Sequence, residues 1–327
     1  MAENVWTDVL NLVRQACDRF HLIPQHRPVA VAFSGGKDSL LLSLALRELG
    51  VPIVCIAVDM GYEADWGRRV TALGKRSHLP VEVIDVRRGI VAEDQEHRRR
   101  ISRSLRALEV IQPGATPCTH CYNVKVAALE NAVRAHDVST VAFGHHRTDA
   151  MASLVKEALM YVDRWDRGHP VFVRDHFSEL VAQLRREAEA PPDAEHALTD
   201  RITELVHTDI VDTDEPPRQP LNRDNPGITA VRPLFFVDEI LIAEIVANRL
   251  ADVEGSGCGH GLAANYLTPR EMVHYRVLQA AHHPWFDAHL QRLLMHGIDA
   301  RGRARLEARR HRIALLGDQY KPGINKS

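Results

Sequence analysis

The stretch Val29-Ala-Val-Ala-Phe-Ser-Gly-Gly-Lys-Asp-Ser-Leu-Leu-Leu-Ser43 decides the fold. Its first five residues form an uninterrupted apolar run, which predicts a strand buried on both faces. Two glycines follow, and apolar residues at helical spacing then run from Leu40 to Leu49, where Gly50 ends the pattern. The stretch therefore predicts a strand, a glycine-containing loop and a helix in direct succession.

The same alternation continues along the chain. Strands are predicted at 53–58, 81–86 and 140–143, and helices at 5–20, 65–77, 92–111, 123–136 and 149–161. This alternation predicts an α/β fold, a doubly wound parallel sheet covered by helices on both faces and preceded by a helical N-terminal segment. Ligands of such sheets bind at the carboxyl ends of the strands, where Ser34, Asp59 and Gly144 fall.

The second half of the chain divides by composition. Proline pairs and acidic residues mark 163–226 as an insertion into the core domain 1–162, with helices expected at 177–189 and 194–206. Residues 227–262 return to the core through an apolar segment at 231–235 and a helix at 237–250. An Arg- and His-rich extension at 263–327 is predicted to be helical from Pro269 to about Leu316, and a solvated helix face is favoured there over an RNA-binding patch.

Composition limits the function classes. With 45% apolar and 26% charged residues among 327, the chain has the balance of a water-soluble globular protein. A formal charge of −2 gives no global field that would attract nucleic acid, so any RNA contact has to be local. No stretch has the pattern of a signal peptide or a membrane span, which leads us to expect a cytoplasmic protein without membrane contacts.

The glycine-containing loop has the features of an anion cradle. Gly35 and Gly36 allow backbone amides to approach an anion, while Ser34 and Ser39 add hydroxyl groups and the following helix adds its positive end. The Walker spacing is absent, which disfavours cleavage between the β and γ phosphates. Asp59, at the end of the second strand, is a candidate nucleotide contact, although a plain turn carboxylate is equally expected.

Two of the five cysteines have the spacing of a metal or redox motif. Pro117-Cys118-Thr-His-Cys121 is predicted to lie in a loop before a helix, so that both sulfur atoms can reach one metal. Cys258 lies in Gly-Ser-Gly-Cys-Gly-His-Gly, whose glycines suit a backbone that wraps around a bulky group. Cys17 and Cys55 are explained better as small buried hydrophobic residues.

The six residues from Ser34 to Ser39 match the signature loop of the ATP-pyrophosphatase (PP-loop) superfamily, whose fold is adenine nucleotide alpha hydrolase-like and whose members cleave ATP between its α and β phosphates. Taken together, the motifs resemble the tRNA 2-thiocytidine synthetase (TtcA-type) family over about residues 5 to 260, excluding the insertion. The motifs that carry this resemblance are Ser34 to Ser39, Cys118 with Cys121, Gly144-His145-His146 with Asp149, Arg232-Pro-Leu234 followed by Glu239, and Cys258.

The resemblance implies an ATP-dependent sulfurtransferase, which adenylates a pyrimidine carbonyl and replaces its oxygen with sulfur, releasing AMP and pyrophosphate. The implied cofactors are ATP, Mg²⁺ and a 4Fe-4S cluster on three cysteines with one iron left open. The implied partners are tRNA and a sulfur donor such as a cysteine desulfurase or free sulfide, and a homodimer is possible. The implied catalytic residues are Lys37, Asp38, Cys118, Cys121 and Cys258, the last three as metal ligands. The implied nucleotide-site residues are Ser34, Gly35, Gly36, Lys37, Asp38, Ser39, Asp59, Gly144, His145 and Asp149.

The chain departs from the family at one point of the site. The family has two acidic residues after Gly-His-His-x, whereas Arg147 is followed here by Thr148, Asp149 and Ala150, which leaves one carboxylate. Three alternatives stay open. The cysteines, with His120 or His260, could hold a structural Zn²⁺ in an amidating or lysidine-forming enzyme. A small-molecule thiolation or desulfuration enzyme and a nucleotide-sensing module are the others.

Overall fold

The computed structural model describes residues 2–61, 65–86, 117–166, 174–211, 216–222, 227–249 and 269–298. The chain divides into two compact units, each built from two separate stretches. Residues Met1–Arg147 and Pro217–Tyr266 form the first, called here the sheet unit, and Thr148–Pro216 and Leu267–Ser327 form the second, the helical unit. The first stretch of the sheet unit ends at Arg147, the first residue of helix α6 (Arg147–Asp166). The boundary predicted at residue 162 lies further along the same helix.

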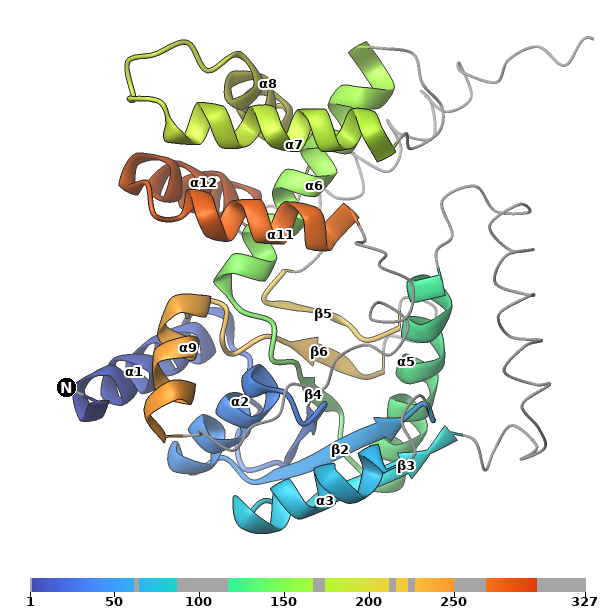
Figure 1. Ribbon diagram of the computed structural model, residues 1–327. Helices are drawn as coiled ribbons and strands as arrows, with labels where there is room; N and C mark the ends of the chain where they lie inside the picture. The colour runs from blue at the N-terminus through green and yellow to red at the C-terminus, as the bar shows by residue number, and fades with distance from the viewer. Residues whose placement is uncertain are drawn as a thin grey trace, which may run out of the picture. The chain divides into compact units, whose positions relative to one another are not determined.

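Within the described residues the sheet unit contains one six-stranded sheet in the order β3-β2-β1-β4-β6-β5 (Figure 1). The strands are β1 (Val29–Ala32), β2 (Ile53–Asp59), β3 (Val81–Asp85), β4 (Thr140–Ala142), β5 (Arg218–Pro220) and β6 (Thr229–Val231). All neighbouring pairs are parallel except β5 and β6. The predicted doubly wound α/β fold is confirmed, and the correction is an antiparallel edge strand inside the range predicted as the insertion.

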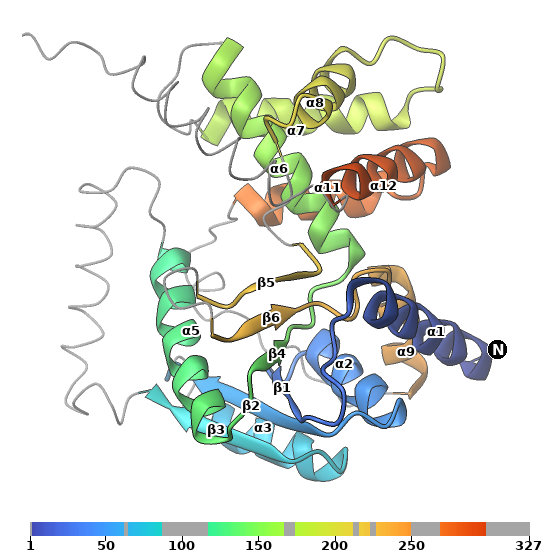
Figure 2. The same ribbon diagram turned by 180° about the vertical axis from the view of Figure 1, so that it is seen from behind.

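Helices cover both faces of the sheet (Figures 1 and 2). On one face, the Cys55 sulfur of β2 lies 3.5 Å from the Ser43 hydroxyl of α2 (Lys37–Glu48). Val81, which pairs with Cys55 in register, lies against α3 (Trp66–Arg76) on the same face. On the opposite face, α5 (Pro117–Ala135) packs its Leu129 and Val133 into a buried cluster with Ala30, Ile56 and Val141. The alternation of strand side chains thus separates two cores.

Two further helices of the sheet unit pack around α2 rather than on the strands. The indole N–H of Trp6 in α1 (Ala2–Phe20) donates to Glu48 at 2.8 Å. The ring of Phe20 makes an edge contact with Phe235, with ring centroids 5.8 Å apart, just before α9 (Glu239–Arg249). These contacts fix the segment from 232 to 239 beside the beginning of α2, which is important for the site below.

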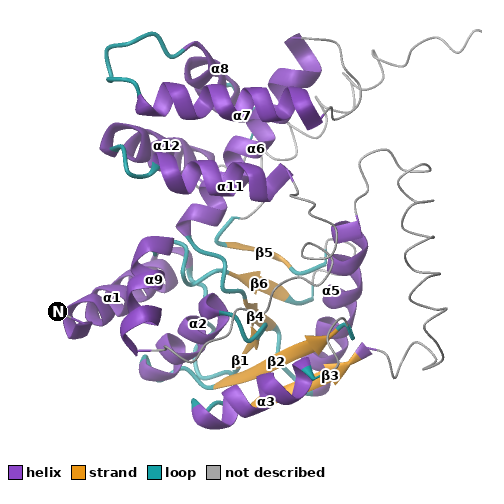
Figure 3. Ribbon diagram, in the orientation of Figure 1, coloured by secondary structure: helices purple, strands orange, loops and turns teal. Residues whose placement is uncertain are grey.

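The helical unit contains α6, α7 (Arg174–Glu189), α8 (Ala197–His207), α11 (Pro269–Ala280) and α12 (Pro284–Ile298), and Figure 3 shows it without strands in its described part. The two helices predicted in the insertion are confirmed as α7 and α8. The helical tail predicted from Pro269 to about Leu316 is confirmed as far as Ile298, as two helices separated by a turn at 281–283, and its remainder lies outside the described residues. Pro284 explains the turn, since a proline lacks the N–H that a continuing helix needs but suits the first turn of a new one.

No helix in the described ranges is both long enough and apolar enough to cross a membrane. The predicted helix at 92–111 and the glycine-rich loop around Cys258 lie outside the described residues. The other predicted helices all correspond to observed ones, with ends that differ by a few residues. The largest such difference, at the start of α5, concerns the cysteine motif.

Candidate functional site

The glycine-containing loop joins β1 to α2, as predicted. Helix α2 begins at Lys37, three residues before Leu40, where the apolar pattern that predicted it starts, and Gly36 is its N-cap in an extended conformation. Gly35 has a φ of +77°, and a Cβ atom there would come within 2.8 Å of a methyl group of Val70. Both the backbone conformation and the space therefore require a glycine at position 35.

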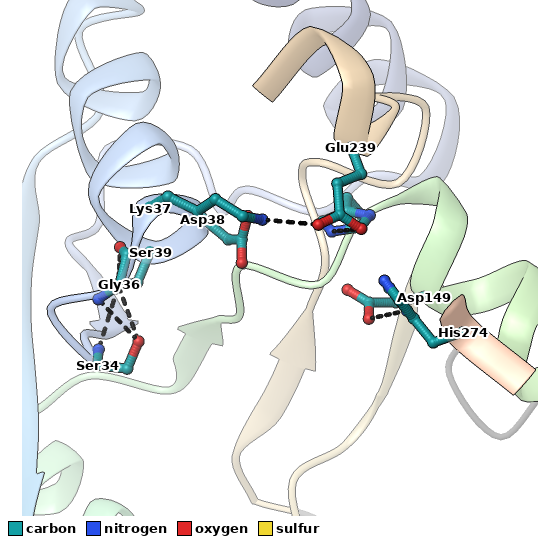
Figure 4. Close-up of polar contacts among 9 residues, drawn as sticks. Ser34, Gly36, Lys37, Asp38, Ser39, Asp149, Glu239 and His274 are labelled. Atoms are coloured by element: carbon teal, nitrogen blue, oxygen red, sulfur yellow. Dashed lines mark hydrogen bonds and ion pairs between the residues drawn. The ribbon is translucent and has the colours of Figure 1, made fainter. Parts of the chain in front are cut away.

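The loop is closed by its own hydroxyl groups (Figure 4). The Ser39 hydroxyl donates to the Gly36 carbonyl at 3.0 Å and accepts the Ser34 N–H at 3.2 Å. The Ser34 hydroxyl accepts the Gly36 N–H at 3.3 Å and lies 3.1 Å from the Ser39 hydroxyl. The first N–H groups of a helix have no acceptor within the helix, so this preshaped loop ends at an anion-binding terminus.

Lys37 provides a fixed positive charge beside the loop (Figure 4). Its Nζ lies 2.6 Å from Asp38 Oδ1 and 3.2 Å from Glu239 Oε1. Burial lowers the pKa of Lys37, but the carboxylates of Asp38 and Glu239 outweigh it and hold the pKa above its ordinary value. The ammonium group is therefore charged at any pH at which the protein would work.

Gly144 brings a second loop into contact with the first. It follows β4, the neighbour of β1, at the point where the strand order reverses direction. A Cβ atom at Gly144 would come within 2.9 Å of the Asp38 carbonyl carbon and 3.0 Å of the Ser39 nitrogen. The two backbones thus touch where a doubly wound sheet binds its ligand, so a side chain at 144 would displace the phosphate loop.

The two histidines after Gly144 have different surroundings. The His145 ring stacks on Phe143 with centroids 5.9 Å apart, and its Nδ1 accepts a hydrogen bond from the Arg232 guanidinium at 3.4 Å. His146 is buried, and its Nε2 lies 3.9 Å from Glu239 Oε2. His145 is thus oriented by Arg232 of the Arg-Pro-Leu motif, whereas His146 faces the carboxylate that also contacts the phosphate loop lysine.

An acidic pair lies at the start of α9; Glu239 is one of the motif residues that carry the resemblance, but the motifs assign no role in the site to either Asp238 or Glu239. Asp238 forms a two-point ion pair with the guanidinium of Arg147, and the Arg147 N–H donates to the Val237 carbonyl at 2.9 Å. Glu239 contacts Lys37 and His146. The sequence signal for this pair was its position just after the Arg-Pro-Leu motif, at a predicted helix start, where carboxylates are favoured.

Asp59 lies at the end of β2, as predicted, but its carboxylate is buried. Its Oδ1 accepts the Gly61 N–H at 2.7 Å, and its side chain is packed beneath α3. This is the arrangement of a turn carboxylate, the second of the two roles expected for it. A contact from Asp59 to the nucleotide stays a prediction.

Asp149 lies in the first turn of α6, within the helical unit. Its Oδ1 is 3.4 Å from Nδ1 of His274 on α11, the pair drawn in Figure 4. The carboxylate that stands alone in the sequence motif therefore has an imidazole neighbour from the C-terminal extension. That neighbour could not be found from the motif, because it comes from a distant part of the chain.

The cysteine motif begins inside a helix rather than before one. Helix α5 starts at Pro117, so the backbones of Cys118 and Cys121 lie in its first turns, a correction to the predicted loop. Proline suits the first helical position, which explains the earlier start. The side chains of these cysteines and the whole of Cys258 lie outside the described residues, so their convergence on a metal stays a prediction.

Of the other two cysteines, Cys55 has the buried role predicted for it, whereas Cys17 is only half-buried. Burial, with a smaller contribution from Asp18, raises the pKa of the Cys17 thiol to about 12. Burial also raises the pKa of Cys55, whose side chain is fully enclosed between β2 and α2. Both thiols are therefore protonated at neutral pH and are poor nucleophiles and poor metal ligands.

The sheet order, the serine- and glycine-containing loop and the close approach of Gly144 define a doubly wound α/β protein with an anion-binding loop at the point where the strand order reverses. In a comparison of structures, the chain is similar to the U34-tRNA thiolase NcsA from Methanococcus maripaludis with its [4Fe-4S] cluster. The TM-score is 0.55 at 15% identity, over 94% of this chain and 81% of that one. This likeness supports the fold.

Curated relatives agree with the narrower resemblance predicted from the motifs. The chain is 32% identical over 147 residues to the tRNA-cytidine(32) 2-sulfurtransferase of Xanthomonas campestris, a match covering 43% of this chain and 44% of the relative. It is 29% identical to the enzyme of the same name from Pelobacter propionicus over 44% of this chain and 50% of the relative. The matches thus span half or less of each relative's length. No model of a protein family matches the chain.

Proposed function

We propose that the chain is an ATP-dependent, iron-sulfur-dependent sulfurtransferase that adenylates a pyrimidine carbonyl in tRNA and replaces its oxygen with sulfur. The observation that carries this proposal is the preshaped phosphate loop with a charged lysine beside it, at the point where the strand order of the sheet reverses. The names of the curated relatives and of the structural neighbour support the sulfur-transfer chemistry and the tRNA substrate.

In the first step of this mechanism, the carbonyl oxygen of the substrate attacks the α phosphorus of ATP and pyrophosphate leaves. Negative charge grows on the leaving pyrophosphate. The backbone N–H groups of the first turn of α2 and the Lys37 ammonium would bind that charge, and a loop already shaped by its own serine hydroxyls does so with little reorganisation. Carboxylates are the protein ligands that Mg²⁺ prefers, and Asp38, beside the phosphate loop, is the residue that would hold it.

In the second step, sulfur adds to the activated carbon and AMP leaves. Three thiolates are a donor set that suits an iron-sulfur cluster with one iron left open, which when bound would supply the sulfide for this step. Cys118 and Cys121 would be helped to stay as thiolates by their position in the first turns of α5, at the positive end of the helix dipole. Cys258 is the proposed third ligand, and the sulfur donor would be a cysteine desulfurase or free sulfide.

Anaerobic purification with iron and sulfide analysis tests the cluster. The wild-type chain and Cys55→Ala, which removes an enclosed thiol, are expected to be brown with about four irons, and Cys258→Ala is expected to lose the cluster. A colourless wild-type protein with one tightly held zinc would contradict the proposal and support an adenylating enzyme whose cysteines are structural.

The adenylation step is tested by release of AMP and pyrophosphate. Lys37→Ala is expected to abolish release in the presence of tRNA, whereas Lys75→Ala, at an exposed position of α3, is expected to leave it unchanged. Salt separates the substrate classes, because binding to tRNA releases counterions and weakens steeply as salt rises. Release that needs no RNA and is insensitive to salt would favour a small-molecule thiolation enzyme.

A further inference from the structure

Glu239, the first residue of α9, connects two loops of the sheet unit that are far apart in sequence. Its Oε1 lies 3.2 Å from Nζ of Lys37 in the phosphate loop (Figure 4). Its Oε2 lies 3.9 Å from Nε2 of His146 in the loop after β4. The Glu239 side chain is 19% exposed and that of His146 is 2% exposed. One carboxylate therefore contacts both loops that meet at Gly144, and it does so in a largely desolvated place.

The position of this carboxylate is set by the backbone around it. The neighbouring Asp238 pairs with Arg147, and the Val237 carbonyl accepts the Arg147 N–H. Leu234, Phe235 and Val237 are buried, so the segment that leads into α9 is anchored by packing. The positive end of α9 also favours a carboxylate in its first turn. Glu239 is thus held in place from several sides.

Asp38 cannot replace Glu239 in orienting the lysine. Asp38 is the next residue along α2 and moves with Lys37, whereas Glu239 belongs to another element and ties the ammonium to a fixed point outside the loop. A lysine side chain has about 2 kcal/mol of rotamer entropy to lose when it is immobilised. Fixing the ammonium before a ligand arrives removes that cost from the reaction.

We propose that Glu239 is a positioning residue, which holds the Lys37 ammonium where negative charge develops on the leaving pyrophosphate. This inference rests on the proposed function. Removing the Glu239 charge has two opposite effects on bound ATP, since it frees the lysine but also removes an anion near the phosphates. Ground-state binding is therefore nearly unchanged, while the transition state, which needs the ammonium at a defined point, loses stabilisation.

The test compares Glu239→Gln, which keeps the shape and removes the charge, with Glu244→Gln, at an exposed position of the same helix. For Glu239→Gln, kcat for pyrophosphate release is expected to fall about 100-fold, as for a misplaced catalytic group, while the Kd of a non-cleavable ATP analogue stays within about three-fold. Glu239→Asp is expected to recover part of kcat, and Glu244→Gln to match the wild type. A weaker affinity for the ATP analogue in Glu239→Gln, with kcat unchanged, would overturn the inference.

A second readout does not depend on turnover. An amine-acylating reagent is applied to the folded chains, and labelling of Lys37 is followed by mass spectrometry, with far-UV circular dichroism to confirm folding. Labelling is expected to be severalfold faster in Glu239→Gln than in the wild type or Glu244→Gln. Equal rates in all three would overturn the positioning role. If the wild type neither binds the ATP analogue nor releases pyrophosphate, the proposed function fails, and the labelling result still decides whether Glu239 positions Lys37.

Discussion

The first backbone N–H groups of a helix need acceptors from outside the helix, and the N-termini of α2 and α8 meet this need in opposite ways. At α8, the carboxylate of Glu187 from the neighbouring α7 accepts the N–H groups of Leu198 and Thr199 at 3.0 and 2.8 Å, and it also accepts the Thr199 hydroxyl. Glu187 is only 8% exposed. At α2, the N-cap is Gly36, which has no side chain with which to accept a bond. A carboxylate of the chain thus accepts the first N–H groups of α8, whereas the N-cap of α2 provides no acceptor side chain, so an external anion can bind there.

The comparison shows how a ligand-binding helix end differs from a structural one. Every helix presents first-turn N–H groups and a partial positive charge. What differs is whether a carboxylate of the chain already satisfies them. A buried acidic residue such as Glu187 can therefore be explained by capping, while a glycine-rich start such as that of α2 favours an external anion.

Adding a carboxylate at the N-cap of α2 is expected to have the largest effect. Gly36 has an extended backbone that other residues can adopt, so Gly36→Asp places an acidic N-cap on α2 and makes it resemble α8. We expect ATP affinity to fall about 100-fold, or about 2.7 kcal/mol, because the new carboxylate competes with phosphate. The free energy of unfolding is expected to rise by only a few tenths of a kcal/mol. Titration calorimetry and urea unfolding measure the two changes, with Gly36→Ser as the uncharged control.

Opening the closed helix end is the reciprocal change. Glu187→Ala leaves the buried N–H groups at the start of α8 without their acceptor, and we expect a loss of about 2 kcal/mol in the free energy of unfolding. ATP affinity is expected to stay at the wild-type value. Urea unfolding beside Glu195→Ala, at an exposed position before α8, measures the difference. If both variants were equally stable, the capping role of Glu187 would be wrong.

Displacing the open helix end without adding charge gives a smaller effect. Gly144→Ala puts a methyl group within 3.0 Å of the backbone of Asp38 and Ser39, so the start of α2 has to shift. We expect about a ten-fold loss in affinity for a non-cleavable ATP analogue, close to 1.4 kcal/mol. Gly50→Ala is the control, because its added Cβ meets nothing within 4 Å while its φ of +76° makes the substitution strained. Gly50→Ala is expected to lower the free energy of unfolding and to leave the affinity for the ATP analogue unchanged.

The smallest expected effect is an acid sensitivity of α8. His289 on α12 lies 2.9 Å from the Thr203 hydroxyl on α8, and burial followed by the charge of Arg292 lowers its pKa. The folded protein therefore favours neutral His289, and the unfolded chain binds the proton more readily. Its contribution to stability is complete above the ordinary histidine pKa of about 6.5 and is lost as pH falls through the lowered value. Urea unfolding between pH 7 and 5 should show a shallower decline in His289→Gln than in the wild type.

The strands and the phosphate loop could be predicted because their signals are local. Val29 to Phe33 is apolar throughout, and the glycines and serines that follow it close the loop through bonds within six residues. Strand β5 was missed since it has only three residues, Arg218, Gln219 and Pro220, with no apolar alternation, and it exists by pairing with β6. Proline is tolerated there because β5 is an edge strand.

The parts of the site that were missed depend on tertiary contacts. Nothing near Lys37 in sequence indicates that Glu239 will contact it, and nothing near Asp149 indicates His274. Similarly, the cap on α8 comes from Glu187, eleven residues before the first N–H group that it accepts. A motif identifies the residues that a ligand would touch, whereas the residues that hold them in place are found only once the chain has folded.

The division of each unit into two separate stretches has a consequence for synthesis on the ribosome. Strand β4 ends at Ala142, but its partner β6 begins only at Thr229, after the whole first stretch of the helical unit has been made. Until then the β4 edge has no neighbour on that side, and α7 and α8 await α11 and α12. Neither unit can finish before the other has begun, and a nascent chain with an open strand edge is prone to aggregate. We therefore expect this chain to depend on chaperones during translation more than a protein of its length with consecutive domains.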